Sequence, residues 1–255
     1  FTLPYELRFL AWKNQTIVYN LLFACVSSTL NDFGLNPKNL GANIGMTTIL
    51  HTHSRRLDYH PHIHVVVPGG GVDKAKKQWK KKKDKYLFNE FALARVFRAR
   101  LLDALNKAGL CVPNSLPSKW VVDCKHVGKG LSALKYLSRY LYRGVISENN
   151  IVSNQNGQVT FKYVHSRTGK TNYRTLKGED FLWLVLQHVL PKGFRRVRDY
   201  GFLHGNAKKL LLLVQMVLQV LIESCKPRPR PVFKCPNCQA PMKIVAFRPP
   251  VWASG

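Results

Sequence analysis

The chain has 255 residues, and 45% of them are hydrophobic, which excludes a disordered chain and fits one large domain or two modest ones. Its 40 lysines and arginines stand against 13 aspartates and glutamates, which gives a net charge of +27 and a pI near 10.2. A folded protein does not need this excess of positive charge. The composition therefore favours a polyanionic partner, and it favours nucleic acid over an anionic membrane surface.

The first predicted elements are a helix and a β-hairpin. The helix runs to about Leu30, with Gly34 beyond its end. Two strands follow at residues 45–55 and 60–71, with a short turn at residues 56–59 between them. The three glycines that end the second strand, residues 69–71, predict a tight turn.

The next predicted elements are a basic loop, a helix and a third strand. Residues 72–88 are rich in lysine and predict a loop or arm. The helix covers residues 89–110, with Asn89 as its N-terminal cap and Gly109 as its stop. Residues 118–128 then predict the third strand.

The second half of the chain predicts more helices, a hairpin and a short tail. Residues 130–146 and 178–191 predict helices, and residues 157–178 predict a hairpin that turns at residues 168–170. The irregular alternation of helices and strands predicts an α+β fold, with an antiparallel sheet and helices on one face. We divide the chain into a main domain (1–200), a C-terminal helix (201–225) and a basic linker with a cysteine tail (226–255).

Histidines gather in the two strands of the first hairpin. Because side chains alternate along a strand, His62 and His64 share one face, and His51, His53 and Arg55 share a face of the preceding strand. An antiparallel hairpin can bring these faces together. The alternative is a set of half-buried, inert histidines, but the spacing favours a metal centre.

Two tyrosines in the helix at residues 130–146 are the second candidate group. Tyr136 and Tyr140 are four residues apart and so share one helix face, whereas Tyr142 lies on another face and is expected to be structural. The alternative is that Tyr136 and Tyr140 only rim the core. Basic residues flank the two tyrosines: Lys135, Arg139 and Arg143.

Four stretches give the chain a family resemblance: FTLPYEL, ILHTHSRRLDYHPHIHVVVPGGG, KYLSRYLYRGVI and DYGFLHGNAKKL, which run from residue 1 to about residue 210. With these stretches in this order, the chain resembles the HUH two-tyrosine rolling-circle transposases of bacterial insertion sequences, which are related to Helitron transposases. The resemblance implies an HUH nuclease-like catalytic domain at residues 1–200. It also implies single-stranded DNA as the substrate, which is nicked and joined through a covalent 5′-phosphotyrosine intermediate.

The resemblance also implies roles for particular residues. The metal ligands are His62 and His64, the nucleophiles are Tyr136 and Tyr140, and the cation is Mg²⁺ or Mn²⁺. Family members often carry glutamine where this chain has Arg55, and arginine cannot bind a cation.

A third metal ligand must then come from elsewhere in the hairpin. His53 is the expected third ligand, with His51 and Asp58 as alternatives.

The lysine-rich stretch at residues 74–85 predicts contacts with DNA phosphates, and Trp79 within it can stack on a base. A solvated flexible loop is the alternative. The expected DNA-binding residues are Trp79, Lys80, Lys81, Lys82, Lys83, Lys135, Arg139 and Arg143. Residues 194–201, FRRVRDYG, form a second basic patch.

The cysteines do not predict a disulfide framework in a chain of this length. Cys235 and Cys238 form a CxxC pair, which is half of a zinc site, and Cys225 is a candidate third ligand. A reduced thiol pair is the alternative.

The start of the chain and its apolar runs bear on cellular location. The chain begins with Phe-Thr-Leu-Pro and no methionine, which suggests a shortened N-terminus, and the resemblance implies a cysteine-rich zinc module upstream. The longest apolar run, residues 210–222, is too short to span a bilayer. We therefore expect a cytoplasmic, nucleoid-associated protein with no membrane partner, and the sequence leaves its oligomeric state open.

The sequence is compatible with three functions. The first is a single-strand DNA nickase and strand transferase. The second is a non-catalytic DNA-binding remnant of a transposase, which Arg55 and the short N-terminus favour. The third is a metal-dependent phosphoesterase that uses water as its nucleophile, with tyrosines that are only structural.

Overall fold

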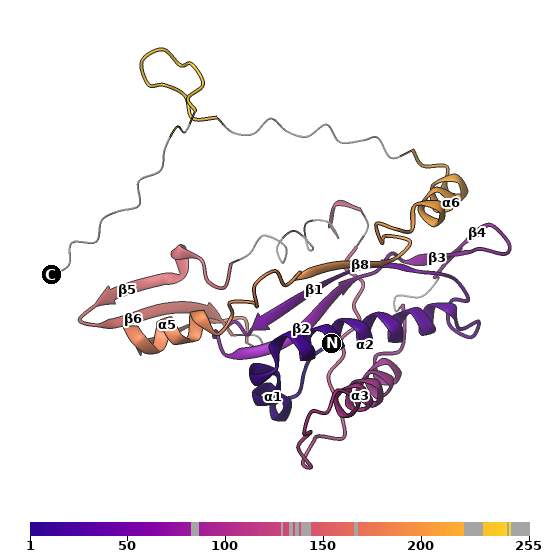
Figure 1. Cartoon of the computed structure of the whole chain (residues 1–255), viewed down its shortest axis with the longest axis horizontal. Helices are drawn as coiled ribbons and strands as arrows, with labels where there is room; N and C mark the ends of the chain where they lie inside the picture. The colour runs from indigo at the N-terminus through magenta and orange to yellow at the C-terminus, as the bar shows by residue number, and fades with distance from the viewer. Residues whose placement is uncertain are drawn as a thin grey trace. The chain divides into compact units, whose positions relative to one another are not determined.

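The computed structural model describes residues 1–82, 87–128, 130–132, 135, 138, 144–165, 168–221, 232–243 and 245. The chain divides into two compact units, Phe1–Val220 and Leu221–Gly255. Within its described residues, the first unit holds three antiparallel sheets and the helices that pack on them, as Figure 1 shows. The α+β class with antiparallel pairing is therefore confirmed.

The main sheet carries the histidine strands. Its strand order is β2–β1–β8, with β1 (Gly45–His53) in the middle, β2 (Tyr59–Val66) on one side and β8 (Val197–Gly201) on the other. β1 and β2 form the antiparallel hairpin that the sequence predicts, and Leu50 lies opposite Ile63. β8 pairs with β1 from far along the chain and was not expected from the sequence.

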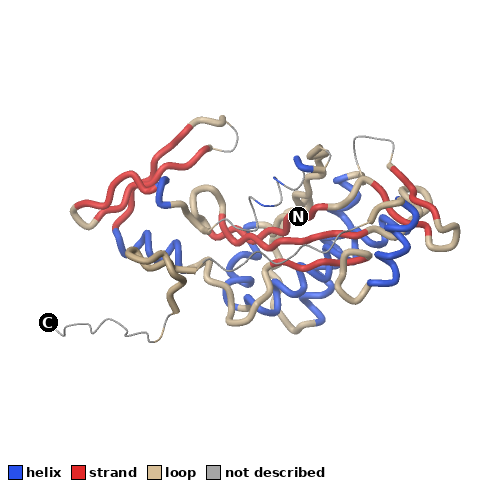
Figure 2. The backbone as a smooth tube through the Cα atoms, turned by 90° about the horizontal axis from the view of Figure 1, so that it is seen from above, coloured by secondary structure: helices blue, strands red, loops and turns tan. Residues whose placement is uncertain are grey.

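Helices cover one face of the main sheet (Figures 1 and 2). They are η1 (Tyr5–Leu7), α1 (Arg8–Lys13), α2 (Gln15–Leu35) and α3 (Glu90–Lys107). The expected single N-terminal helix is broken at Asn14, whose side chain donates to the Leu10 carbonyl and so competes with the helical backbone. α3 matches its prediction, because the Asn89 side chain accepts a hydrogen bond from the Ala92 N–H at 3.0 Å.

The strand predicted at residues 118–128 is wrong. No residue of this segment belongs to a strand, and the Val121 carbonyl accepts a hydrogen bond from the Thr2 N–H at 3.1 Å. Residues 1–3 lie along the outer edge of β2, because the Leu3 N–H donates to Pro61 and the Ile63 N–H donates to Phe1. That edge is therefore already occupied, and Trp120 is buried in the core instead.

The basic segment after β2 is a hairpin rather than a loop. β3 (Gly70–Asp73) pairs with β4 (Gln78–Lys81), and the tight turn expected at the glycines is absent because Gly70 and Gly71 lie inside β3. A side chain at Gly71 would collide with the Asn43 carbonyl at 2.6 Å, so this strand needs glycine for close packing. Helix α6 (Lys208–Leu218) packs on the hairpin through a small core of Val72, Phe202 and Val214.

A second three-stranded sheet extends from one end of the main sheet (Figure 2). Its strands are β5 (Ile151–Gln155), β6 (Gln158–Val164) and β7 (Thr171–Lys177). The short 3₁₀ turn η2 (Glu148–Asn150) precedes the sheet, and helix α5 (Gly178–Leu186) covers it. The predicted β6–β7 hairpin is confirmed, but β5 was missed and α5 ends five residues before Pro191. Phe161 and Phe181 form the core between this sheet and α5.

Gly201, at the end of β8, gives a prediction about stability. Its φ is +61°, and a side chain there would overlap the carbonyl oxygen of Ile44, the residue just before β1. Gly157 has a similar φ of +71° in the β5–β6 turn but has open space around it. We expect Gly201→Ala to lower the free energy of unfolding by about 3 kcal/mol or more, and Gly157→Ala by only about 1–2 kcal/mol. Equal losses in chemical denaturation would contradict the close packing at Gly201.

Candidate metal centre

Three histidines meet on the face of the main sheet opposite the helices. Thr48, Leu50 and Ile63 are buried against the helices, so the alternating residues of both strands point to the other face. His51 of β1 lies directly opposite His62 of β2. His64 is two residues further along β2, and one ring nitrogen from each of the three lies within 4.8 Å of the others.

Two of these rings are oriented by hydrogen bonds. His62 Nδ1 lies 2.6 Å from the His60 carbonyl oxygen, and because a carbonyl can only accept, Nδ1 carries the proton. In the neutral ring the lone pair is then on Nε2, which lies 3.1 Å from His64 Nε2. A backbone carbonyl that fixes one ring nitrogen while the other is free to bind a cation is the usual support of a metal-ligating histidine.

The cluster keeps its histidines neutral. Burial above all, together with the positive charge of neighbouring histidines, lowers the pKa of His62 to about 2 and the pKa of His64 to about 3. Neutral imidazole is the form that binds metal ions, so near pH 7 these ligands need not lose a proton first. The donor set of three nitrogen ligands fits a divalent transition ion such as Mn²⁺ better than Mg²⁺.

The same shifts predict acid sensitivity without metal. Below pH 6.5 the histidines of the unfolded chain bind protons, whereas half-buried His62 and His64 of the folded chain stay neutral, so the free energy of unfolding should fall as the pH decreases from 7 to 5. One such histidine accounts for about 2 kcal/mol at pH 5. Denaturation in a chelator should show this loss, and His62→Asn should reduce it, whereas replacing exposed His126 should not. A pH-independent stability would contradict the burial of the cluster.

His53, the third ligand expected from the sequence, is not in the cluster that the described residues form. The pairing register shifts between His51 and His53, so that His53 lies opposite Tyr59. Its ring stacks on His51 at 5.7 Å between centroids and lies 5.3 Å from the ring of His188. The structure therefore brings His51, the alternative ligand, together with His62 and His64.

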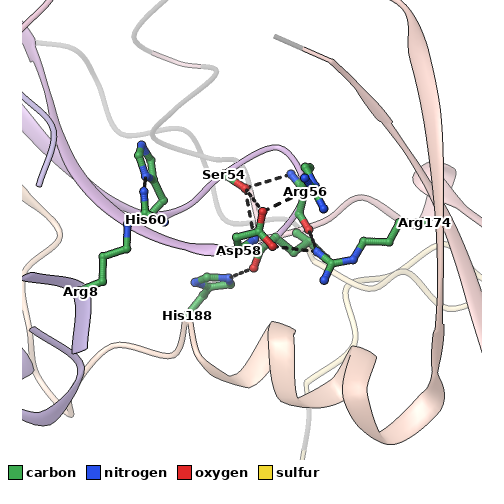
Figure 3. A network of polar contacts seen from close by, with 8 residues as sticks. Arg8, Ser54, Arg56, Asp58, His60, Arg174 and His188 are labelled. Carbon is green, nitrogen blue, oxygen red and sulfur yellow. Dashed lines mark hydrogen bonds and ion pairs between the residues drawn. The ribbon is translucent and has the colours of Figure 1, made fainter. Parts of the chain in front are cut away.

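Asp58, the other alternative ligand, takes part in a polar network at the β1–β2 turn (Figure 3). Its carboxylate accepts from Arg174 at 2.9 Å and from Ser54 at 3.3 Å. His188 donates to the Leu57 carbonyl at 2.9 Å, and Leu57 has a φ of +68° with its side chain buried in the core of the second sheet. Asp58 therefore ties the turn to β7 through Arg174.

Two residues of β2 next to the histidine cluster form hydrogen bonds with residues outside it. His60 accepts a hydrogen bond from Arg8 (Figure 3), and burial lowers its pKa to about 4. The Tyr59 hydroxyl lies 2.6 Å from that of Tyr19 on the helix side, and burial raises the pKa of Tyr19 to about 12 and raises that of Tyr59 as well. Tyr59 is therefore not a suitable nucleophile, although it is adjacent in sequence to the histidines.

Residues 45–210, which include the whole hairpin, match the family model described as "Putative transposase". This match covers more than half of the chain. The chain belongs to this transposase family. It is similar over 238 residues, with 35% identity, to putative transposase y4qJ of Sinorhizobium fredii, which covers 84% of this chain and 60% of that protein.

A second relative of this transposase-family chain comes from another bacterium. The transposase for insertion sequence element IS801 of Pseudomonas savastanoi pv. phaseolicola is 28% identical over 274 residues, covering 97% of this chain and 63% of that protein. The chain thus spans about three-fifths of the length of both relatives. No solved structure matches it. Among its described residues, no helix is long and apolar enough to cross a membrane.

The proposed nucleophiles of the transposase-family chain, Tyr136 and Tyr140, lie outside the described residues, as do Arg139 and Arg143. The described residues around them are helical, as the sequence predicts: Leu131, Ser132, Lys135 and Ser138. All four are exposed, including Lys135 of the expected basic stripe.

Some of the predicted DNA-binding residues of the basic segment make contacts within the protein, whereas others are exposed to solvent. Lys80 donates to the Gly41 carbonyl at 2.8 Å and pairs with Asp73 at 2.9 Å, so it holds the hairpin together. Trp79 lies against Phe202 with ring centroids 6.0 Å apart, which covers part of its stacking surface. Lys81 is exposed, Lys82 follows β4, and Lys83 lies outside the described residues.

The cysteine tail forms a tight turn in the second unit. Lys234 bridges to Pro241, and the Cys235 N–H donates to the Ala240 carbonyl at 2.9 Å. Hydrogen bonds from the backbone N–H groups of Cys238 and Asn237 lower the pKa of the Cys235 thiol. A thiol of this kind suits metal binding, but Cys225, the expected third ligand, lies outside the described residues.

Proposed function

We propose that this chain is the catalytic part of a rolling-circle transposase that nicks and joins single-stranded DNA. The observation that carries the proposal is the cluster of His51, His62 and His64 on one face of a hairpin, with neutral rings and converging nitrogens. Membership of the transposase family supports DNA as the substrate.

The three histidines would hold a divalent cation, which supplies Lewis-acid polarisation of a phosphodiester. In this proposal His51 replaces His53 as the third ligand, because the described geometry groups it with the other two. The His60 carbonyl positions His62 through its Nδ1–H, and the register of β1 against β2 positions His51. Rigid strands suit this task because ligand positions must hold within a fraction of an ångström.

The nucleophile in this proposal is Tyr136 or Tyr140. The phenolic oxygen attacks the phosphorus, a P–Oη bond forms, and the bond to the 3′ oxygen breaks. The phenol proton ends on the departing 3′-hydroxyl, so atoms and charges balance without a further reactant. The phosphotyrosine ester conserves the energy of the phosphodiester, and a second 3′-hydroxyl can reverse the reaction to join a new strand.

The rest of the proposal concerns DNA binding and location. The net charge of +27 provides phosphate contacts that give affinity rather than sequence choice. The proposal takes the single-stranded substrate from the resemblance to rolling-circle transposases, and it takes the cytoplasmic, nucleoid-associated location from the sequence. A zinc ion held by Cys235 and Cys238 also remains a proposal.

One experiment tests this function against its alternatives. The chain is incubated with labelled single-stranded oligonucleotides and Mn²⁺, and the products are separated on a denaturing gel. A covalent protein–DNA adduct is the expected result. Cleavage without an adduct would indicate a phosphoesterase that uses water, and binding without cleavage would indicate a non-catalytic remnant. Either result would overturn the proposal.

A further inference from the structure

A large pocket lies at β8, the outer strand of the main sheet among the described residues, and its lining does not include the histidine cluster. Its volume is about 740 Å³, within the range of roughly 300–1,000 Å³ that is usual for small-molecule sites. Its walls come from the start of α2, the loop that precedes β8, β8 itself and the loop that follows it. The basic patch FRRVRDYG, which the proposed chemistry does not use, supplies one side of this pocket.

The charge of the pocket suits an anion. Three cationic side chains line it, Lys192, Arg195 and Arg198, against the single carboxylate of Asp199. One oxygen of that carboxylate accepts a hydrogen bond from the Thr47 hydroxyl at 2.6 Å, which offsets part of its repulsion of an anion. Lys192 and Arg195 line the pocket and are exposed to solvent, so they can contact a phosphate.

The inner part of the pocket suits a flat ring. The guanidinium of Arg198 lies 4.2 Å from the ring centroid of Phe23 and 5.0 Å from that of Phe194, and it donates to Asn20 at 2.6 Å. These contacts hold the planar group in place where it lines the pocket. A fixed guanidinium is a stacking surface for a nucleobase, and Tyr200 and Asn206 beside it offer hydrogen-bonding groups.

The pocket lies within reach of the histidine face around the edge of the sheet. Asp199 is opposite Thr47, which has the same strand parity as His51, whereas Arg198 is opposite Thr48 on the helix side. The pocket therefore wraps around β8, the strand next to the one that carries His51. A strand of DNA that leaves the histidine face across β8 would meet it.

We propose that this pocket binds one nucleotide unit of the single-stranded DNA, with the base stacked on Arg198 and the phosphate beside Lys192 and Arg195. This inference rests on the proposed function, because it extends the path of the same substrate. It adds a second DNA contact that involves neither the histidines nor the tyrosines.

The first test measures the salt dependence of binding. A labelled twelve-nucleotide thymidine strand is titrated by fluorescence anisotropy in a chelator, so that no cleavage occurs. Lys192→Ala plus Arg195→Ala should reduce the slope of log K against log salt by about 0.7, because the two side chains share one phosphate and each phosphate contact on a single strand contributes about that amount. Arg95→Ala plus Lys119→Ala removes two exposed charges from α3 and the loop before Trp120 and should leave the slope unchanged.

The second test separates base stacking from charge. Arg198→Lys keeps the charge but loses the planar group, so the preference for the thymidine strand over an abasic strand of equal length should fall about fivefold or more. Its thermal unfolding is compared with that of the wild type to verify the fold. Displacement of the strand by equimolar thymidine monophosphate would show that a free nucleotide is the ligand and would overturn the DNA assignment.

The outcomes for this pocket and for the proposed function are distinguishable. An unchanged salt slope in the Lys192 and Arg195 variant, or equal slopes in both double variants, overturns the pocket proposal. The adduct assay of the wild-type chain is independent of these slopes. If the wild-type chain forms no adduct but the Lys192 and Arg195 variant has a reduced salt slope, the nickase proposal is wrong and the pocket still binds DNA.

Discussion

Replacing both Tyr136 and Tyr140 by phenylalanine is expected to remove every covalent protein–DNA adduct, a loss on the order of 10³-fold or more. The phenolic oxygen is the only atom deleted from each side chain, so the fold and DNA affinity should persist. The measurement is adduct yield on a denaturing gel with single-stranded DNA and Mn²⁺. A double variant that still forms the adduct would place the nucleophile elsewhere.

The single tyrosine variants should behave differently from the double variant. One phenol can hold one broken end, whereas strand transfer must break a donor and a target strand and exchange them. Either Tyr136→Phe or Tyr140→Phe should therefore keep some nicking but lose complete transfer. Tyr142→Phe is the matched control, because Tyr142 follows Tyr140 by two residues and falls on another helix face in the expected helix.

The second large effect is expected from His62→Ala plus His64→Ala. Without these ligands the cation would no longer polarise the phosphate, and because that polarisation is worth several kcal/mol, cleavage should fall roughly 10³-fold or more. DNA affinity should change little, since phosphate contacts come from lysines and arginines elsewhere. The measurements are nicking rate and anisotropy, and replacement of exposed His126 by alanine serves as the control. Unchanged cleavage would rule out the metal role.

Single substitutions in the otherwise wild-type chain identify the third metal ligand. His51→Ala should weaken Mn²⁺ binding about 100-fold or more, whereas His53→Ala should cost no more than the roughly 10- to 100-fold typical of a residue that only supports a ligand, through its stacking on His51. Titration of Mn²⁺ by calorimetry measures both. A larger loss for His53→Ala would restore His53 as the ligand expected from the sequence.

The histidine hairpin could be predicted because its information is local. Alternation within residues 45–66 fixes which side chains share a face, and the turn is short enough to force antiparallel pairing. What the alternation did not reveal is the register shift after His51, which removes His53 from the cluster. The shift lies next to the turn in which Leu57 adopts a positive φ and is buried in the core of the second sheet, a contact between distant parts of the chain.

Other parts of the fold depend on distant partners and were missed for that reason. β8 is a strand because β1 offers it an edge, and residues 118–128 are not a strand because residues 1–3 already occupy the edge of β2. The β5–β6 hairpin did have a local signal in Asn156–Gly157, which both adopt positive φ in a two-residue turn. β5 was missed because most of its residues are exposed, so its sequence does not show the apolar and polar alternation of a half-buried strand.

The most direct test of the central claim is to identify the residue that carries the DNA. The adduct is trapped, its DNA is trimmed by nuclease, and the protein is digested with trypsin and analysed by mass spectrometry. Trypsin cuts after Lys135, Arg139 and Arg143, so Tyr136 falls in the peptide YLSR and Tyr140 in the peptide YLYR. The proposed function predicts a nucleotide mass on Tyr136 or Tyr140, present with Mn²⁺ and absent with a chelator. A nucleotide on any other residue, or a yield that does not depend on metal, would contradict it.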